Sequence, residues 1–297
     1  MSVAINRDLP AFDILKSEKI DVISKKNIGS NENTIKLALV NLMPTKEKTE
    51  VQFLRRIANT PFIVDVDFIA MRSHKSKNTS IFHIEKFYKA YDDIKGRKYD
   101  AMIVTGAPVE DFEFEDLDYW NELINILEFA KKSVFSTIFV CWSSQAALYY
   151  YYGVERKKLE RKLFGIYKCN LNKNIDITNG FDESFYVPHS RHTFSSISDI
   201  NKINDIDIIS SSDEVGLNIA ATKDERFIFL TGHGEYDRKT LELEYIRDVE
   251  KGKEISIPQN YYINDNKDLG IPIKWRSHSS LLFQNWINFC GKNKFFK

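Results

Sequence analysis

The stretch Val134–Tyr150 constrains the fold of this chain more than any other part of the sequence. It opens with an apolar, β-branched run, Val134–Val140, which is too short to span a membrane and is typical of a buried strand in a parallel sheet. Cys141 follows without any turn residues, and a helix-forming segment that contains Ala146 and Leu148 begins at once. The stretch therefore predicts a strand that passes directly into a helix.

Cys141 can be interpreted in two ways at this point. At a strand-to-helix turn, the N–H groups of the first helical turn point at the sulfur and favour the reactive thiolate. Free cysteine is also among the most frequently buried residue types, and a small core residue at the end of a strand fits the same pattern. Both interpretations stay open until other residues are considered.

Apolar runs of strand length alternate with segments of helical spacing before this stretch. We expect strands at 36–42, 62–69 and 99–105, helices at 49–59 and 120–130, a weaker helix at 83–91 and a polar loop at 27–33. This rhythm predicts a doubly wound α/β fold with a mostly parallel sheet. Such sheets place their chemistry at the carboxyl ends of the strands, so the loops 43–46, 106–110 and 141–142 are expected to meet there.

The second half of the chain is richer in short strands. We expect strands at 163–167, 184–187 and 206–209, a hairpin of 215–222 with 226–231, and helices at 240–251 and 280–290. Neither a repeat nor a linker divides the sequence. We predict a single domain over 1–297, with an N-terminal arm (1–34), a catalytic core (35–251) and a C-terminal extension (252–297).

Composition argues against several classes of protein. The 42 basic and 42 acidic residues balance, which gives no footprint for nucleic acid or an anionic membrane. No apolar run approaches the ~20 residues of a membrane span, and we expect no signal peptide and a cytoplasmic location. The three separated cysteines favour a reducing environment. His189 and His192 have no nearby ligand partner, so we expect no metal site.

His233 and Glu235 follow the second strand of the expected hairpin. Residues two apart in an extended segment point to the same side, so the carboxylate can orient the imidazole ring and stabilise its cation. With Cys141 at another strand end, these residues supply a nucleophile, a base and an orienting group. The spacing thus favours a Cys-His-Glu triad over an ordinary buried cysteine.

Several motifs resemble the homoserine O-acyltransferases of methionine biosynthesis, and the resemblance runs nearly end to end. They are Asn41-Leu-Met-Pro-Thr-Lys46, Thr105-Gly-Ala-Pro-Val-Glu110, Phe139-Val-Cys-Trp142 with Gln145-Ala-Ala147, Gly180-Phe-Asp182, Pro188-His-Ser-Arg-His192, Thr231-Gly-His-Gly-Glu-Tyr-Asp237 and Trp275-Arg-Ser-His278. The family has a class I glutamine amidotransferase-like (flavodoxin-like) fold, which agrees with the sheet expected above. The resemblance also suggests a homodimer.

The resemblance implies a mechanism and a set of site residues. Cys141 would take the acyl group of an acyl-CoA as a thioester, and His233, held by Glu235, would deprotonate the hydroxyl of L-homoserine. Acyl-CoA is a co-substrate, and no further cofactor is implied. The family pattern also places three residues at the amino-acid substrate, namely Lys162, Ser190 and Arg247. An arginine suits the substrate carboxylate because its guanidinium group binds carboxylates with two hydrogen bonds.

Two further positions bear on the reaction. The backbone N–H of Trp142 is placed to stabilise a developing oxyanion, and Lys46 at the first strand end can add positive charge. The family carries a small residue or a glutamate at Glu110, where a carboxylate would repel the free carboxylate of a succinyl group. We therefore predict acetyl-CoA as the donor, with a succinyltransferase as the alternative.

Two departures from the family pattern concern the residues around the triad. Ser143-Ser144 replaces other small residues after Cys-Trp, and Ser143 is a candidate for a hydrogen bond near the sulfur. Gly234 stands where the family usually has proline, which frees the backbone between base and orienting group.

Two other classes of protein remain as alternatives. A glutamine amidotransferase-type hydrolase shares the nucleophile pattern, but Phe139 and Ser143 stand where that class has glycines, and no ammonia-acceptor domain is visible. A catalytically inactive binding protein is the last alternative, and the complete triad argues against it.

Overall fold

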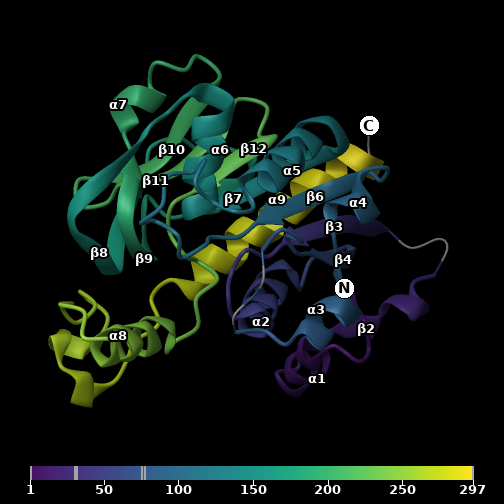
Figure 1. Cartoon of the computed structure of the whole chain (residues 1–297), viewed down its shortest axis with the longest axis horizontal. Helices are drawn as coiled ribbons and strands as arrows, with labels where there is room; N and C mark the ends of the chain where they lie inside the picture. Colours follow the sequence, from purple (N-terminus) through teal and green to yellow (C-terminus); the bar gives the residue numbers. More distant parts are fainter. Residues whose placement is uncertain (1, 30–32, 75, 77, 296–297) are drawn as a thin grey trace.

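The computed structural model describes residues 2–29, 33–74, 76 and 78–295, and these residues form one sheet of twelve strands (Figure 1). The strand order is β2-β1-β4-β3-β6-β7-β12-β11-β10-β8-β9, and β5 pairs with β4 off this path. The loop expected at 27–33 includes residues 30–32, which lie outside the described residues.

The part of the sheet from β2 to β12 is parallel. Its strands are β1 (Val3–Ile5), β2 (Val22–Ser24), β3 (Thr34–Val40), β4 (Ile63–Ile69), β5 (Tyr88–Lys89), β6 (Tyr99–Val104), β7 (Val134–Val140) and β12 (Phe227–Leu230). Side chains of β7 alternate between two cores, with Ile138 and Val140 in one and Val134 and Phe139 in the other. This burial on both faces explains the continuous apolar runs of the central strands.

Helices cover both faces of the parallel part, which confirms the doubly wound arrangement (Figure 1). One core includes side chains of α1 (Pro10–Ser17), α2 (Lys46–Ile57) and α9 (Arg276–Phe295), and the other includes side chains of α5 (Trp120–Ser133) and α6 (Trp142–Tyr152). Shorter helices are α3 (Ile81–Phe87), α4 (Tyr91–Ile94) and α7 (Ile197–Ile200). Both α2 and α9 begin earlier than the sequence pattern indicated, so Lys46 lies in the first turn of a helix.

The remaining part of the sheet is antiparallel. It consists of β11 (Gly216–Thr222), β10 (Ile206–Ser212), β8 (Arg156–Leu171) and β9 (Ser184–Ser195). The expected hairpin of β11 and β12 is confirmed. The β8–β9 ribbon is much longer than predicted, because the amino-terminal part of β8 is charged and largely exposed and so shows no apolar alternation. Its register shifts between Lys158 and Leu163.

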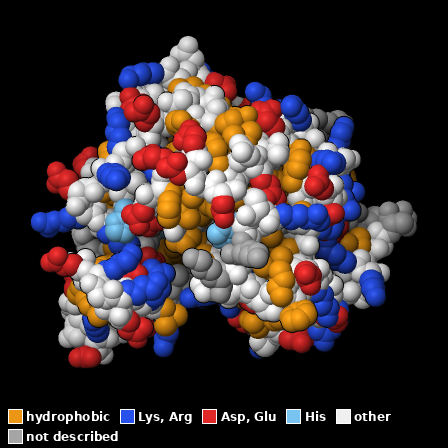
Figure 2. All heavy atoms as spheres, viewed as in Figure 1, with side chains coloured by type: hydrophobic (Ala, Val, Ile, Leu, Met, Phe, Trp, Pro, Cys, Tyr) orange, Lys and Arg blue, Asp and Glu red, His pale blue; other side chains and the backbone are white. Residues whose placement is uncertain are grey.

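A small lobe around α8 (Thr240–Glu250) stands beside the ribbon, and Figure 2 shows a notch between it and the part of the molecule that carries α1 and α2. It has a third core, made by Phe164, Ile166, Tyr236, Leu241, Tyr261, Tyr262, Ile271 and Trp275. Gln259 joins the lobe to β8 through two backbone hydrogen bonds, with Ile166 (2.8 Å) and Phe164 (2.9 Å). Within the described residues, no helix is long and apolar enough to cross a membrane.

Candidate active site

Cys141 occupies the turn between β7 and α6, as the sequence predicted. Its backbone is left-handed, with φ 53° and ψ −111°, a conformation that is strained for a residue with a side chain. Such a turn directs the sulfur away from the sheet and towards the amino end of the helix. Because α6 begins at Trp142, the N–H of Trp142 has no acceptor within the helix and is available for an oxyanion.

Gly106 shows how closely the second triad residue approaches. A Cβ atom built at Gly106 would lie 3.5 Å from the Cys141 Cβ and 3.6 Å from the His233 Cε1. The carboxyl ends of β6, β7 and β12 therefore bring a glycine, the cysteine and the histidine to one place. A larger side chain at position 106 would occupy the space between nucleophile and base.

His233 and Glu235 form the expected pair, with 2.7 Å between the His233 Nδ1 and the Glu235 Oε1. Both side chains are buried, and the Tyr236 ring stacks on the imidazole at 4.2 Å between centroids. Burial alone would lower the pKa of His233, but the neighbouring Glu235 and Cys141 together raise it well above its ordinary value. The environment therefore favours an imidazolium beside the sulfur.

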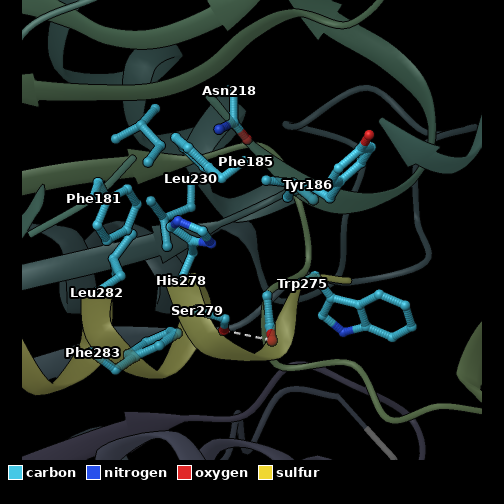
Figure 3. Close-up of a pocket in the computed structure, with 14 residues that line it drawn as sticks. Phe181, Phe185, Tyr186, Asn218, Leu230, Trp275, His278, Ser279, Leu282 and Phe283 are labelled. Carbon is cyan, nitrogen blue, oxygen red and sulfur yellow. Dashed lines mark hydrogen bonds between the residues drawn. The ribbon is translucent and has the colours of Figure 1, made fainter. Parts of the chain in front are cut away.

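Gly234 does not leave the loop between His233 and Glu235 unconstrained. The Ser279 hydroxyl on α9 donates a 2.6 Å hydrogen bond to the Gly234 carbonyl, and a Cβ at position 234 would lie 2.5 Å from that hydroxyl oxygen. An apolar pocket lies behind the loop, and Figure 3 shows aromatic side chains of β9 and α9 around it, including Phe185 and Phe283. The loop is thus supported by α9.

Helix α6 is fastened to β9 one turn after the nucleophile. The Gln145 amide donates to the Thr193 carbonyl at 3.1 Å and accepts from the Thr193 hydroxyl at 2.8 Å, and Arg191 donates to the same carbonyl at 2.8 Å. Ser143 does not bond to the sulfur as considered above. Its hydroxyl donates to the Val104 carbonyl at 2.7 Å and so ties the first turn of α6 to β6.

Lys46 is 6% exposed at the amino end of α2, and its ammonium group donates to the backbone carbonyls of Asn41 (2.5 Å) and Met43 (3.3 Å). Burial lowers its pKa to about 8, although Glu50 and Glu47 oppose the shift. The position of Lys46 at the carboxyl end of β3 agrees with its expected place at the edge of the sheet that carries the triad. The Trp142 indole packs against Phe114 and Tyr119, at 5.6 Å and 6.2 Å between ring centroids.

The three residues expected at the amino-acid substrate meet in one cluster. Lys162 donates to the carboxylates of Glu244 (2.7 Å) and Asp248 (3.1 Å) on α8. Ser190 donates to Glu244 at 2.6 Å, and Arg247 contacts Asp248 through two nitrogens at 2.7 Å and 2.9 Å. Strands β8 and β9 and helix α8 thus each contribute to the cluster.

Sequence reasoning missed the two carboxylates that organise this cluster. Glu244, Arg247 and Asp248 are spaced i, i+3 and i+4, so they share one side of α8, and this spacing was a usable signal. Tyr236, stacked on His233, was also missed. It is deeply buried, and Glu244 is among the charges that raise its pKa, which places the cluster near the triad.

Glu110 lies in the turn after β6, with 3.9 Å between its Oε1 and the Nε2 of His192 on β9. Its side chain is 29% exposed. His192 also lines a cavity that is shared with Lys162 and Asp248. The structure therefore places Glu110 beside the ribbon that carries the substrate cluster, with a histidine next to its charge.

The other two cysteines are buried away from this site. Burial raises the pKa of the Cys169 thiol to about 12 and that of Cys290 well above its ordinary value. His189 is fully buried, and neither of its ring nitrogens has a hydrogen-bond partner within the described residues. No group of three or more His, Cys, Asp or Glu side chains in the described part of the chain is arranged to hold a metal ion.

Comparison with known proteins gives a family and a fold. The model of a family described as homoserine O-succinyltransferase matches residues 2–295. A homoserine O-acetyltransferase of Clostridium botulinum is 47% identical over 292 residues, which cover 98% of this chain and 95% of that protein. Homoserine O-acetyltransferase 1 of Ilyobacter polytropus is 44% identical over 292 residues, with 98% and 97% covered.

Solved structures share the fold at low sequence identity. A glutamine amidotransferase from Thermotoga maritima superimposes with a TM-score of 0.57 at 10% identity, covering 87% of this chain and 98% of that one. A GMP synthase component from Thermoplasma acidophilum gives 0.55 at 12% identity, covering 88% and 96%. These likenesses confirm the class I glutamine amidotransferase-like fold.

Proposed function

This chain belongs to the homoserine O-succinyltransferase family, and on that basis we propose that it is a homoserine O-acetyltransferase that acts in methionine biosynthesis. The observation that carries the proposal is the meeting of Cys141 with the His233–Glu235 pair at adjacent strand ends. Relatives named as acetyltransferases at 44–47% identity support the choice of donor.

In the first half-reaction the Cys141 sulfur, having given its proton to His233, attacks the carbonyl carbon of acetyl-CoA. The Trp142 N–H and the Lys46 ammonium are proposed to stabilise the oxyanion of the tetrahedral intermediate. The bond from carbon to the CoA sulfur then breaks, and His233 returns the proton to the CoA sulfur. The products are free CoA and an acetyl thioester on Cys141.

In the second half-reaction His233 takes the proton of the homoserine hydroxyl, and the hydroxyl oxygen attacks the acetyl carbon. The carbon–sulfur bond to Cys141 breaks and the product is O-acetyl-L-homoserine. We assign the substrate carboxylate to Lys162 and Arg247, with Ser190 beside them. The Glu244 and Asp248 carboxylates supply acceptors for the ammonium group, which a zwitterionic substrate requires.

Glu110 is proposed to select the acetyl donor, because its carboxylate would repel the free carboxylate of a succinyl group. The opposite donor preference is the alternative within the same family. We also propose a homodimer in the cytoplasm, without a cofactor beyond acetyl-CoA. The elution mass from size-exclusion chromatography with light scattering measures the dimer.

The deciding experiment is to incubate the protein with acetyl-CoA alone and to search for an acetyl group on Cys141 by mass spectrometry. Addition of L-homoserine should remove the adduct and yield O-acetylhomoserine, and a Cys141→Ala variant is the control. A parallel reaction with succinyl-CoA should give little adduct, and more succinyl than acetyl adduct would reverse the choice of donor. Ammonia release from glutamine without any acyl adduct would instead identify an amidotransferase-type hydrolase.

A further inference from the structure

A buried polar network surrounds Lys46 on the side away from the solvent. Its members come from four elements, namely Asn41 after β3, Lys46 and Glu50 on α2, His83 on α3 and Tyr88 on β5. Asn41 and Glu50 are completely buried, and His83 is nearly so. Polar groups at this depth are costly unless they are hydrogen-bonded, so their arrangement calls for a physical reason.

The network is continuous from Lys46 to His83. The Asn41 carbonyl accepts from the Lys46 ammonium at 2.5 Å, and the Asn41 side-chain amide donates to the Tyr88 hydroxyl at 3.0 Å. That hydroxyl donates to the Glu50 Oε1 at 2.6 Å, and the His83 Nε2 contacts the same oxygen at 2.7 Å. Each link is within hydrogen-bonding distance.

Glu50 is the costly member of this network. Its second carboxylate oxygen is buried and has no hydrogen-bond partner within the described residues. Burial raises the pKa of Glu50, although its hydrogen bonds with Tyr88 and His83 act in the opposite direction. Glu50 lies one helical turn after Lys46, so the two side chains project from the same side of α2.

We propose that Glu50 and Tyr88 are positioning residues for Lys46, which hold its ammonium group charged and aimed at the oxyanion by fixing Asn41 and by supplying a nearby negative charge. The inference rests on the role proposed above for Lys46. Two carbonyl oxygens fix the direction of the ammonium group but carry no net charge, and Glu50 supplies what they lack. Neither residue is proposed to touch substrate.

The inference predicts a specific change in pH dependence. Lys46 has a pKa of about 8, so its charge is lost as the pH rises through that value. Removing the carboxylate charge of Glu50 removes a contribution that raises the pKa, and the alkaline limb of kcat/KM should move to lower pH. Other ionisable groups near Lys46 or lining the adjacent cavity are Glu47, Arg72, His74, Glu85, Tyr88, Lys89, Asp93 and Tyr119, and all of them are unchanged by this substitution.

The test compares pH profiles of kcat/KM for acetyl-CoA in the wild-type protein, Glu50→Gln and Tyr88→Phe. We expect the alkaline limb of Glu50→Gln to fall by about one pH unit. Tyr88→Phe should lower kcat with little change in the KM for homoserine. The matched control is Glu85→Gln, an exposed acid that lines the same cavity and should leave the limb in place.

A second comparison separates positioning from a general loss of structure. In a Lys46→Arg background the guanidinium keeps its charge at every pH used, so Glu50→Gln should no longer move the limb. The Lys46 pKa is also measured without activity, by the pH dependence of trace labelling with acetic anhydride, and it should fall in Glu50→Gln.

The possible outcomes are distinct. An unchanged limb and an unchanged labelling pKa in Glu50→Gln overturn the inference, and so does a shift that persists with Lys46→Arg. If the wild-type protein forms no acetyl-Cys141, the proposed function fails instead, while the labelling experiment still decides whether Glu50 holds the charge of Lys46.

Discussion

At the scale of single residues, the charge of Glu110 bears on the choice of substrate. The carboxylate is partly shielded, with His192 at 3.9 Å, and both residues border the region of the substrate cluster. A negative charge in such a place acts on a ligand through a lower dielectric than that of water. Its effect is therefore expected on donor choice and not on stability.

Replacing Glu110 with glycine should raise kcat/KM for succinyl-CoA roughly tenfold to a hundredfold, as expected when one partly screened like-charge contact is removed. The value for acetyl-CoA should change much less. His192→Lys is a matched test, because it leaves Glu110 in place and offsets its charge, and it should move the ratio in the same direction. Unchanged succinyl-CoA turnover in Glu110→Gly would show that the charge does not select the donor.

His189 makes a prediction about acid stability. Burial, with Arg191 and His233 nearby, lowers its pKa in the folded protein well below the ordinary value of about 6.5. The unfolded chain therefore binds the proton first, and the free energy of unfolding should fall as the pH drops below about 6.5, by up to about 1.4 kcal/mol per pH unit. His233, whose folded pKa is raised, has the opposite sign and acts above that pH.

Urea unfolding between pH 5 and 8 measures this slope. His189→Gln should reduce the acid slope even if it lowers stability overall, whereas His192→Gln, on a more exposed ring, should leave it unchanged. An equal slope in all three proteins would assign the acid sensitivity to other groups.

At the scale of elements, the loop that carries His233 depends on α9. Ser279 donates to the Gly234 carbonyl and leaves no room for a Cβ at position 234. The glycine that seemed from the sequence to loosen the triad is therefore matched to a partner on a helix 45 residues further along the chain. A single sequence cannot reveal that match, because the two positions are not linked by any local pattern.

Gly234→Ala should lower the free energy of unfolding by about 1–3 kcal/mol through overpacking, together with kcat. Ser279→Gly should relieve the clash, so the double variant should be more stable than the sum of the single effects predicts. Gly96→Ala is the control, since a Cβ there meets nothing within 4 Å. Additive effects in thermal unfolding of the four proteins would rule out the proposed contact.

Much of the parallel sheet and of the triad could be predicted because their signals are local. Strands buried on both faces appear as continuous apolar runs, and the His-x-Glu spacing needs only one extended segment. The β8–β9 ribbon could not be sized in this way, because charged side chains line its exposed part. Glu244 and Asp248 were missed because helix α8 displays them like ordinary solvated acids until Lys162 is brought against them.

At the scale of the whole molecule, helix α9 closes one of the two large cores. Trp286 is fully buried in it, and its indole N–H donates to the Ser136 hydroxyl on β7 at 2.9 Å. The end of the chain is thus part of the sheet domain in space, although it is remote from the central strands in sequence. This packing makes global stability depend on the last helix.

Trp286→Ala should cost about 3–5 kcal/mol of unfolding free energy, since it removes a large buried side chain and leaves the Ser136 hydroxyl without its indole donor. Denaturant unfolding followed by circular dichroism measures the loss. Ser277→Ala, on an exposed position of the same helix, should stay within about 0.5 kcal/mol of the wild-type protein. A loss below about 1 kcal/mol for Trp286→Ala would show that α9 does not close the core as described.

The hydrogen bonds of Gln259 with Phe164 and Ile166 have a consequence for engineering. They join the α8 lobe to the ribbon, so Lys162 and its two carboxylate partners are carried by one connected unit. A graft that aims to exchange the amino-acid acceptor of this enzyme would have to transplant β8, β9 and the lobe together. Loops exchanged singly would separate the cation from the acids that hold it.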